Sequence, residues 1–228
     1  MSTARPPAVA PLIAGQKLSQ ADFHERYEAT PPGFRAELIG GIVVMPSPVG
    51  NRHGIISAGA LFWLGYYRSR TRGVEVSDNA TAILDDLGEV QPDALLRIKP
   101  ENRGQTRKHG KYIGGAPELV VEVADSSKAT DLGAKLADYE RAGTREYVVL
   151  AIEPDEVHWH ELRDGRLVRV APDPDGLYRS RVFPGLWLDP NALLNDDGSA
   201  LVAVLERGLA TEEHAAFVAD LAARPERR

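Results

Sequence analysis

The sequence predicts an α/β fold in which helices pack on a mixed β-sheet. Apolar residues recur at helical spacing over residues 53–69, which predicts an amphipathic helix. The run 119–123 is apolar and β-branched, which is typical of a central strand buried on both faces. A second such run, 146–152, follows after a helical stretch that ends at Gly143. Together these features predict a core in the order helix, strand, strand, strand, helix, strand.

The N-terminal part reads as an arm followed by a small unit. Residues 1–16 are rich in Pro and Ala and predict a flexible arm. Ser19 can cap a short helix over 20–29. Residues 34–45 read as two strand pieces around the turn Gly40-Gly41, which makes an extra N-terminal β-hairpin.

The remaining elements follow from apolar runs and from the Gly and polar clusters between them. We expect a main domain over 17–194, an extra C-terminal hairpin within it, and a helical tail over 195–228. The expected elements after the first long helix are strands over 74–84 and 90–98, a loop over 99–115, a strand over 119–123, a helix from 127 or 130 to about 142, a strand over 146–152, and hairpin strands over 157–162 and 167–170.

Composition narrows the chemistry that the chain can perform. The sequence has no cysteine, which excludes disulfides and thiolate metal sites and leaves oxygen and nitrogen as metal ligands. It has no secretory-type leader and no apolar run of about 18 residues, so we expect no membrane span. These features are compatible with a cytoplasmic protein.

Charge is distributed unevenly along the chain. The net charge is -6, which argues against a general nucleic-acid coat protein. Residues 1–152 carry 18 Lys+Arg against 18 Asp+Glu, whereas residues 153–228 carry 9 against 15. A local basic surface is therefore expected only in the first part.

Two carboxylates and a lysine form the main candidate site. Asp93 follows a proline near a strand, and Glu122 lies inside the apolar run, where a carboxylate is costly unless it is paired or binds a cation. Asp131, Lys135 and Tyr139 are spaced four apart, so they share one helix face that can approach the carboxylates. The alternative is a structural Glu122–Lys135 ion pair beside a strand-ending Asp93. The combination on this element order favours a site that holds a hard divalent cation.

The ordered motifs resemble the PD-(D/E)XK nuclease superfamily, and more narrowly its restriction-endonuclease family of the Uma2 type. The resemblance covers about residues 34–194. The matching stretches are residues 37–41, 45–48 with His53, 91–93, 117–123, 131–135 with Tyr139, 143–147 and 183–186. The resemblance implies a restriction-endonuclease-like core.

The resemblance also implies roles for individual residues. Asp93 and Glu122 would be Mg²⁺ ligands, with Mn²⁺ as a substitute and the Val123 backbone carbonyl as a possible third ligand. The superfamily usually places its catalytic lysine two residues after the glutamate, where this chain has Ala124. The resemblance implies that in the related family the following helix supplies the lysine, which here is Lys135.

Further candidates surround this site. Glu37 is either an additional acidic member or a surface charge, and His53 either contacts a phosphate or water or simply begins a helix. His158 and His160 alternate on one strand face, but no third zinc ligand is apparent. The basic loop between the two ligand strands is a candidate nucleic-acid contact, and the alternative is a solvated loop. Its candidate contacts are Arg103, Arg107, Lys108 and Lys111.

The leading hypothesis is a Mg²⁺-dependent endonuclease that hydrolyses DNA with a metal-activated water. Cleavage of both strands of a duplex needs two sites, so a homodimer is expected, as the related family also implies. Two alternatives remain open at this point. One is a nucleic-acid-binding or regulatory module of the same fold without catalysis, which Ala124 and the acidic balance favour. The other is a dimeric interaction protein that docks a partner through its acidic C-terminal part.

Overall fold

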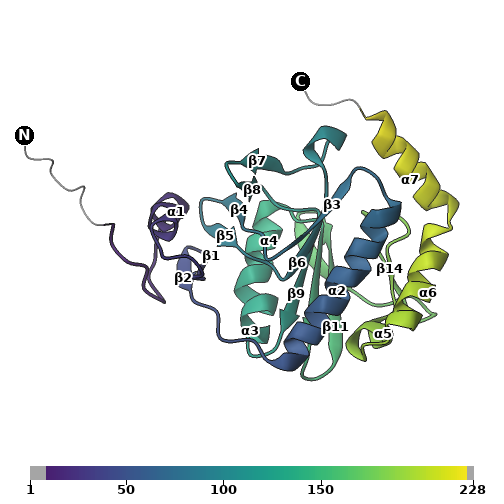
Figure 1. The fold of residues 1–228 in the computed structure, drawn as a ribbon, viewed down its shortest axis with the longest axis horizontal. Helices are drawn as coiled ribbons and strands as arrows, with labels where there is room; N and C mark the ends of the chain where they lie inside the picture. Colours follow the sequence, from purple (N-terminus) through teal and green to yellow (C-terminus); the bar gives the residue numbers. More distant parts are fainter. Residues whose placement is uncertain (1–8, 225–228) are drawn as a thin grey trace, which may run out of the picture.

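Two β-sheets and two layers of helices make up the protein (Figure 1). The computed structural model describes residues 9–224. The main sheet has the strand order β12-β11-β10-β9-β6-β3. Its strands are β3 (Val74–Asp78), β6 (Ala94–Ile98), β9 (Leu119–Ala124), β10 (Glu146–Ala151), β11 (Glu156–Arg163) and β12 (Arg166–Val170). Strands β9 and β10 are parallel and all other neighbours are antiparallel, so the prediction of a mixed sheet is confirmed.

A second sheet adjoins the main one and has the order β2-β1-β5-β4-β8-β7. Its strands are β1 (Glu37–Ile39), β2 (Ile42–Val44), β4 (Ala82–Asp85), β5 (Gly88–Val90), β7 (Arg107–His109) and β8 (Tyr112–Gly114). The expected hairpin around Gly40-Gly41 is present as β1–β2, with both glycines at positive φ. Helix α1 (Gln20–Glu28) begins after Ser19, whose hydroxyl accepts the Asp22 N–H as predicted.

Three expectations about this region were wrong, because periodicity does not show which sheet a strand joins. The single strand expected over 74–84 is split into β3 and β4, which lie in different sheets. The chain changes sheet near Asn79, whose φ is 48°. The strand expected over 90–98 is split into β5 and β6 around Pro92. The loop expected over 99–115 contains the hairpin β7–β8 and a short 3₁₀ helix, Pro100–Asn102.

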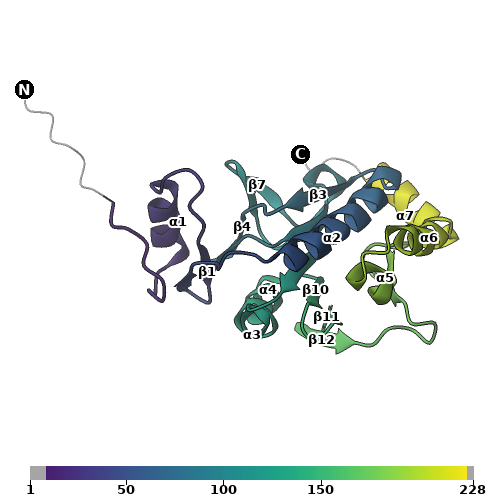
Figure 2. The ribbon, with the colours of Figure 1, turned by 60° about the horizontal axis from the view of Figure 1, so that its bottom comes forward.

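The main sheet is buried on both faces by helices. Helix α2 (Asn51–Arg70) packs on one face, and α3 (Lys128–Thr130), η2 (Asp131–Lys135) and α4 (Leu136–Ala142) form a continuous helical segment on the other (Figure 2). Alternation along β9 sends Val121 into the core beneath α2 and Val120 into the core beneath α4. Gly143, at φ 86°, ends α4 as predicted.

The chain ends pack with the domain where the structure describes them. The expected tail over 195–228 contains α6 (Gly198–Leu209) and α7 (Glu212–Ala223), which follow α5 (Pro190–Leu194). Leu201, Leu205 and Leu221 are buried in the same core as α2. Of the arm expected over 1–16, residues 1–8 lie outside the described residues. Leu12 is buried and Gly15 N–H donates to Val43 O, so the end of the expected arm packs on the domain.

The hairpin β11–β12 confirms the expected C-terminal hairpin. A short pair, β13 (Tyr178–Arg179) and β14 (Trp187–Leu188), lies between it and the final helices. No helix within residues 9–224 has the combination of length and apolar composition that is needed to cross a bilayer.

Candidate metal centre

Asp93 lies where the main sheet opens. The β6–β9 ladder ends at the pair Ala94–Val121, and beyond it Val123 N–H has the Asp93 carboxylate as its acceptor, at 2.7 Å from Oδ2. Pro92 precedes Asp93 and has no N–H to continue the ladder. The break in the strand therefore results from the same residues that present the carboxylate.

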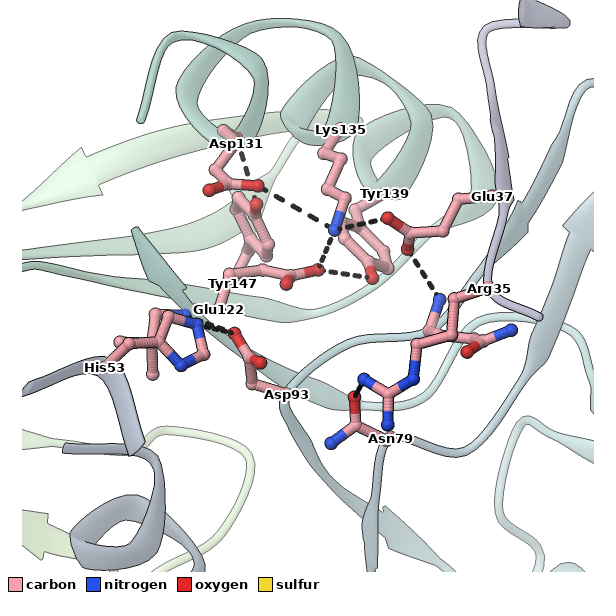
Figure 3. Close-up of polar contacts among 12 residues, drawn as sticks. Arg35, Glu37, His53, Asn79, Asp93, Glu122, Asp131, Lys135, Tyr139 and Tyr147 are labelled. Atoms are coloured by element: carbon pink, nitrogen blue, oxygen red, sulfur yellow. Dashed lines mark hydrogen bonds and ion pairs between the residues drawn. The ribbon is translucent and has the colours of Figure 1, made fainter. Parts of the chain in front are cut away.

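Glu122 points from the middle of β9 to the helical segment on the α4 side (Figure 3). Its Oε1 accepts from Lys135 Nζ at 3.1 Å and from the Tyr139 hydroxyl at 3.0 Å. Both donors come from the helix face that the sequence predicted. Asp131 shares that face, with Oδ1 at 3.8 Å from Lys135 Nζ. The predicted arrangement of Asp131, Lys135 and Tyr139 is therefore observed.

A third carboxylate reaches the same lysine from the second sheet. Glu37 on β1 places Oε2 at 3.2 Å from Lys135 Nζ, and its Oε1 accepts the Gln91 N–H at 2.7 Å. Glu37 is thus buried beside the site. The alternative interpretation, a surface charge, is wrong. One ammonium group has Glu37, Glu122 and Asp131 around it.

Burial and charge act against each other in this cluster. Burial raises the pKa of Glu122 well above its usual value, and the Lys135 ammonium offsets only part of this rise. Burial lowers the pKa of Lys135, but the carboxylates of Glu122, Glu37 and Asp131 outweigh this and raise it above its usual value. Burial also raises the pKa of Asp131. Lys135 therefore stays charged, whereas burial favours the neutral forms of Glu122 and Asp131.

His53 approaches the other carboxylate from the first turn of α2. Its Nε2 lies 3.5 Å from Asp93 Oδ2. The contact with Asp93 raises the pKa of His53, although partial burial acts in the opposite direction. His53 therefore both lies in the first turn of α2 and faces the site, and its contact with a phosphate or a water stays a prediction.

These residues line one cavity of about 280 Å³. Glu37, His53, Asp93, Glu122, Val123 and Lys135, all named from the sequence, contribute to its wall. The wall contains five carboxyl groups against two permanent cations, Lys135 and Arg35. Such an excess of acidic oxygens is the donor chemistry of a hard divalent cation.

Asp93 and Glu122 are the two carboxylates of the cavity that could serve as the protein ligands of a Mg²⁺ ion. Within residues 9–224, no three Asp, Glu or His side chains converge to hold a metal ion. Mg²⁺ commonly takes one or two carboxylates and completes its shell with water and substrate phosphate. Asp93 and Glu122 each have one oxygen without a hydrogen-bond partner among the described residues, Oδ1 and Oε2 respectively.

Comparison with known proteins places the chain in a family. A family model described as "Putative restriction endonuclease", Uma2, matches residues 21–191. The chain belongs to the Uma2 family. A crystal structure described as a putative nuclease, from Anabaena variabilis ATCC 29413, shares the fold with a TM-score of 0.53 at 15% identity. The match covers 79% of this chain and 97% of the other. Among curated proteins, the comparison found no match.

Family membership makes this chain a nuclease-family protein, and the fold confirms the expected restriction-endonuclease-like core. In this Uma2 chain, Ala124 occupies the position of the usual lysine and is buried in the core beneath α4. Lys135 is the lysine that the fold brings to the carboxylates instead.

The structure does not bring the basic loop to the cavity. Arg103 follows the short 3₁₀ helix, Arg107 and Lys108 lie on β7, and Lys111 forms an ion pair with Glu28. None of the four lines the cavity wall. Their contact with nucleic acid remains a prediction for a surface away from the carboxylates.

His158 and His160 are both buried on β11, and burial lowers the pKa of each. Within residues 9–224, they belong to no group of three His, Asp or Glu side chains that could hold a metal ion. Sequence reasoning missed three charged or amide residues of the cavity wall, Arg35, Asn79 and Asp125. The spacing of Arg35 and Glu37 could have indicated Arg35. The two residues are two apart, and an extended chain places such residues on one face.

Proposed function

We propose that this Uma2 protein is a Mg²⁺-dependent endonuclease that hydrolyses DNA phosphodiester bonds. One observation carries the proposal. Asp93, directly before β6, and Glu122, on the adjacent strand β9, both line one acidic cavity, and Lys135 contacts Glu122 there. Buried carboxylates that outnumber the nearby cations are unfavourable, and a bound divalent ion would stabilise their ionised form.

The carboxylates would hold the ion through the oxygens that face no protein donor. Asp93 is oriented by Val123 N–H and Glu122 by Lys135 and Tyr139, so neither carboxylate needs to reorganise. The Val123 backbone carbonyl is a possible third ligand. Bound Mg²⁺ would polarise the phosphate and lower the pKa of a water. Mn²⁺ would substitute for Mg²⁺ because both prefer oxygen ligands.

Lys135 has two roles in this proposal. Its ammonium offsets part of the burial penalty on Glu122 and so favours the ionised, metal-binding form. It also lines the cavity, where a fixed cation would stabilise the charge that develops on the phosphate in the transition state. His53, beside Asp93, would contact a phosphate oxygen or a water at the same wall.

Calorimetric titration of Mn²⁺ and plasmid cleavage in Mg²⁺ test the proposal together. We expect wild type to bind Mn²⁺ and cleave DNA, and Asp93→Asn to lose both. Glu25→Gln is the matched control, since Glu25 is exposed on α1 and forms no ion pair with a described residue. The proposal is wrong if wild type cleaves no DNA and binds no Mn²⁺ even with duplex DNA present.

We further propose a homodimer, because cleavage of both strands needs two copies of the cavity. Sedimentation of the full chain tests this.

A second candidate function is DNA binding without cleavage, which Ala124 at the usual lysine position favours. DNA binding that needs no metal and is unchanged in Asp93→Asn would support the second candidate over the first.

A further inference from the structure

Arg35 lies at the mouth of the acidic cavity, two residues before β1. Its side chain is exposed, and Figure 3 shows it extending toward Asn79, across the cavity from His53. Its contact to Asn79 Oδ1 measures 3.5 Å, longer than a typical N–H···O hydrogen bond. Among the described residues it forms no ion pair with any carboxylate. Most of its donors are therefore available to a ligand.

The other cations of the cavity wall are already engaged. Lys135 lies within ion-pair distance of Glu37, Glu122 and Asp131. His53 faces Asp93. Arg35 is thus the wall residue whose positive charge is not offset by a carboxylate in the described part of the chain.

A polyanion that enters this cavity meets a wall with an excess of carboxylates. A divalent ion would offset part of that charge at Asp93 and Glu122, but it acts only on the phosphate that it contacts. The neighbouring phosphates of a DNA strand would still be repelled. A guanidinium group at the mouth can hold one of them through two parallel N–H donors.

We propose that Arg35 is a substrate-binding residue that holds a backbone phosphate of DNA at the mouth of the cavity. The proposal rests on the proposed nuclease function, since it requires DNA to enter there. Asn79 would keep the guanidinium oriented until the phosphate replaces this long contact. Arg35 contributes to binding and not to the chemical step.

The test is fluorescence anisotropy with a labelled DNA duplex in Ca²⁺, over a series of salt concentrations. We expect Arg35→Gln to weaken binding about tenfold and to reduce the slope of log affinity against log salt by about one. Arg35→Lys should recover the salt slope but only part of the affinity, because lysine keeps the charge without the fork. The matched control is Arg68→Gln, an exposed arginine near the other end of α2, which we expect to bind as wild type does.

Two further measurements separate this proposal from the nuclease proposal. Mn²⁺ titration should be unchanged in Arg35→Gln, and cleavage should show a raised KM with a similar kcat. If wild type binds duplex and Arg35→Gln has the same affinity and salt slope, the role of Arg35 is refuted while the nuclease proposal stands. An equal loss in Arg68→Gln would likewise refute it. If wild type does not bind duplex at all, the role of Arg35 is refuted, and Mn²⁺ titration with plasmid cleavage still decides the nuclease proposal.

Discussion

At the scale of single residues, the site consists of charged side chains that are buried close together. Lys135 is 6% exposed and has three carboxylates around it. Removing a charged group from water is unfavourable, so each member of this cluster depends on the others for compensation. The lysine therefore stabilises the fold as well as preparing Glu122 for a metal.

Lys135→Met tests the structural part of this role. It leaves the shape similar but removes the cation, so we expect a loss of roughly 3–5 kcal/mol in the free energy of unfolding. Urea denaturation measures it. Adding Glu122→Gln should recover part of the loss, because one uncompensated carboxylate disappears. Lys108→Met, on exposed β7, is the control. A loss no greater than in this control would contradict the argument.

At the scale of elements, the site depends on the docking of the β1–β2 hairpin against α4. Asp138 on α4 makes that contact: its Oδ2 accepts Gly40 N–H at 2.6 Å, and its Oδ1 accepts from Arg141 at 2.8 Å. Arg141 continues to Asp85 on β4 at 2.7 Å. The same interface, nearer the cavity, contains the Glu37–Lys135 pair. Asp138 thus holds the hairpin that supplies Glu37.

Asp138→Ala should loosen the hairpin. It leaves the Gly40 N–H without its acceptor and Arg141 with one partner fewer, so we expect about 2 kcal/mol less stability. Hydrogen exchange should accelerate at Gly40 and in β1–β2 more than in β9 or β10. The control is Glu25→Ala on α1. Uniform acceleration across the main sheet would show that Asp138 supports the whole domain and not the hairpin.

At the scale of the whole molecule, the two helix layers pack on opposite faces of the main sheet. The C-terminal helices contribute to the core beneath α2. Glu146, at the start of β10, ties the segment leading to those helices to the sheet. It is fully buried, and it accepts hydrogen bonds from the Ser180 hydroxyl and the Arg181 N–H. Burial raises its pKa to about 7, although these donors act in the opposite direction.

This raised pKa predicts a pH dependence of stability. Between about pH 4.5 and 7 the unfolded chain ionises Glu146 while the folded protein keeps it protonated, so the contribution of Glu146 is lost as pH rises to 7. Glu146→Gln removes this loss. From pH 4.5 to 8, the mutant should therefore gain on the order of 3 kcal/mol in unfolding free energy relative to wild type. Urea denaturation across that pH range measures the difference, with Glu25→Gln as control. A difference independent of pH would show that Glu146 does not titrate as expected.

The sequence by itself determined most of the local elements and the residues of the candidate site. Helical spacing placed Asp131, Lys135 and Tyr139 on one face, and an acidic residue inside the apolar run 119–123 identified Glu122 as exceptional. The first inference rests on the helical period of 3.6 residues, and the second on the cost of burying a carboxylate, and a single segment displays both signals. The family resemblance added the expected roles, with Asp93 and Glu122 as metal ligands and Lys135 in place of the lysine that the superfamily usually has two residues after the glutamate.

Only the tertiary structure decided how distant segments meet. Strands 74–84 and 90–98 were expected to be continuous, and they break because the chain passes between two sheets there. Glu37 reaches Lys135 across 98 residues of sequence, Arg35 reaches the cavity mouth, and the basic loop does not. Local sequence patterns indicate which face of a segment is apolar. They do not indicate which segments meet, because the free energy of each contact depends on the groups that are buried beside it.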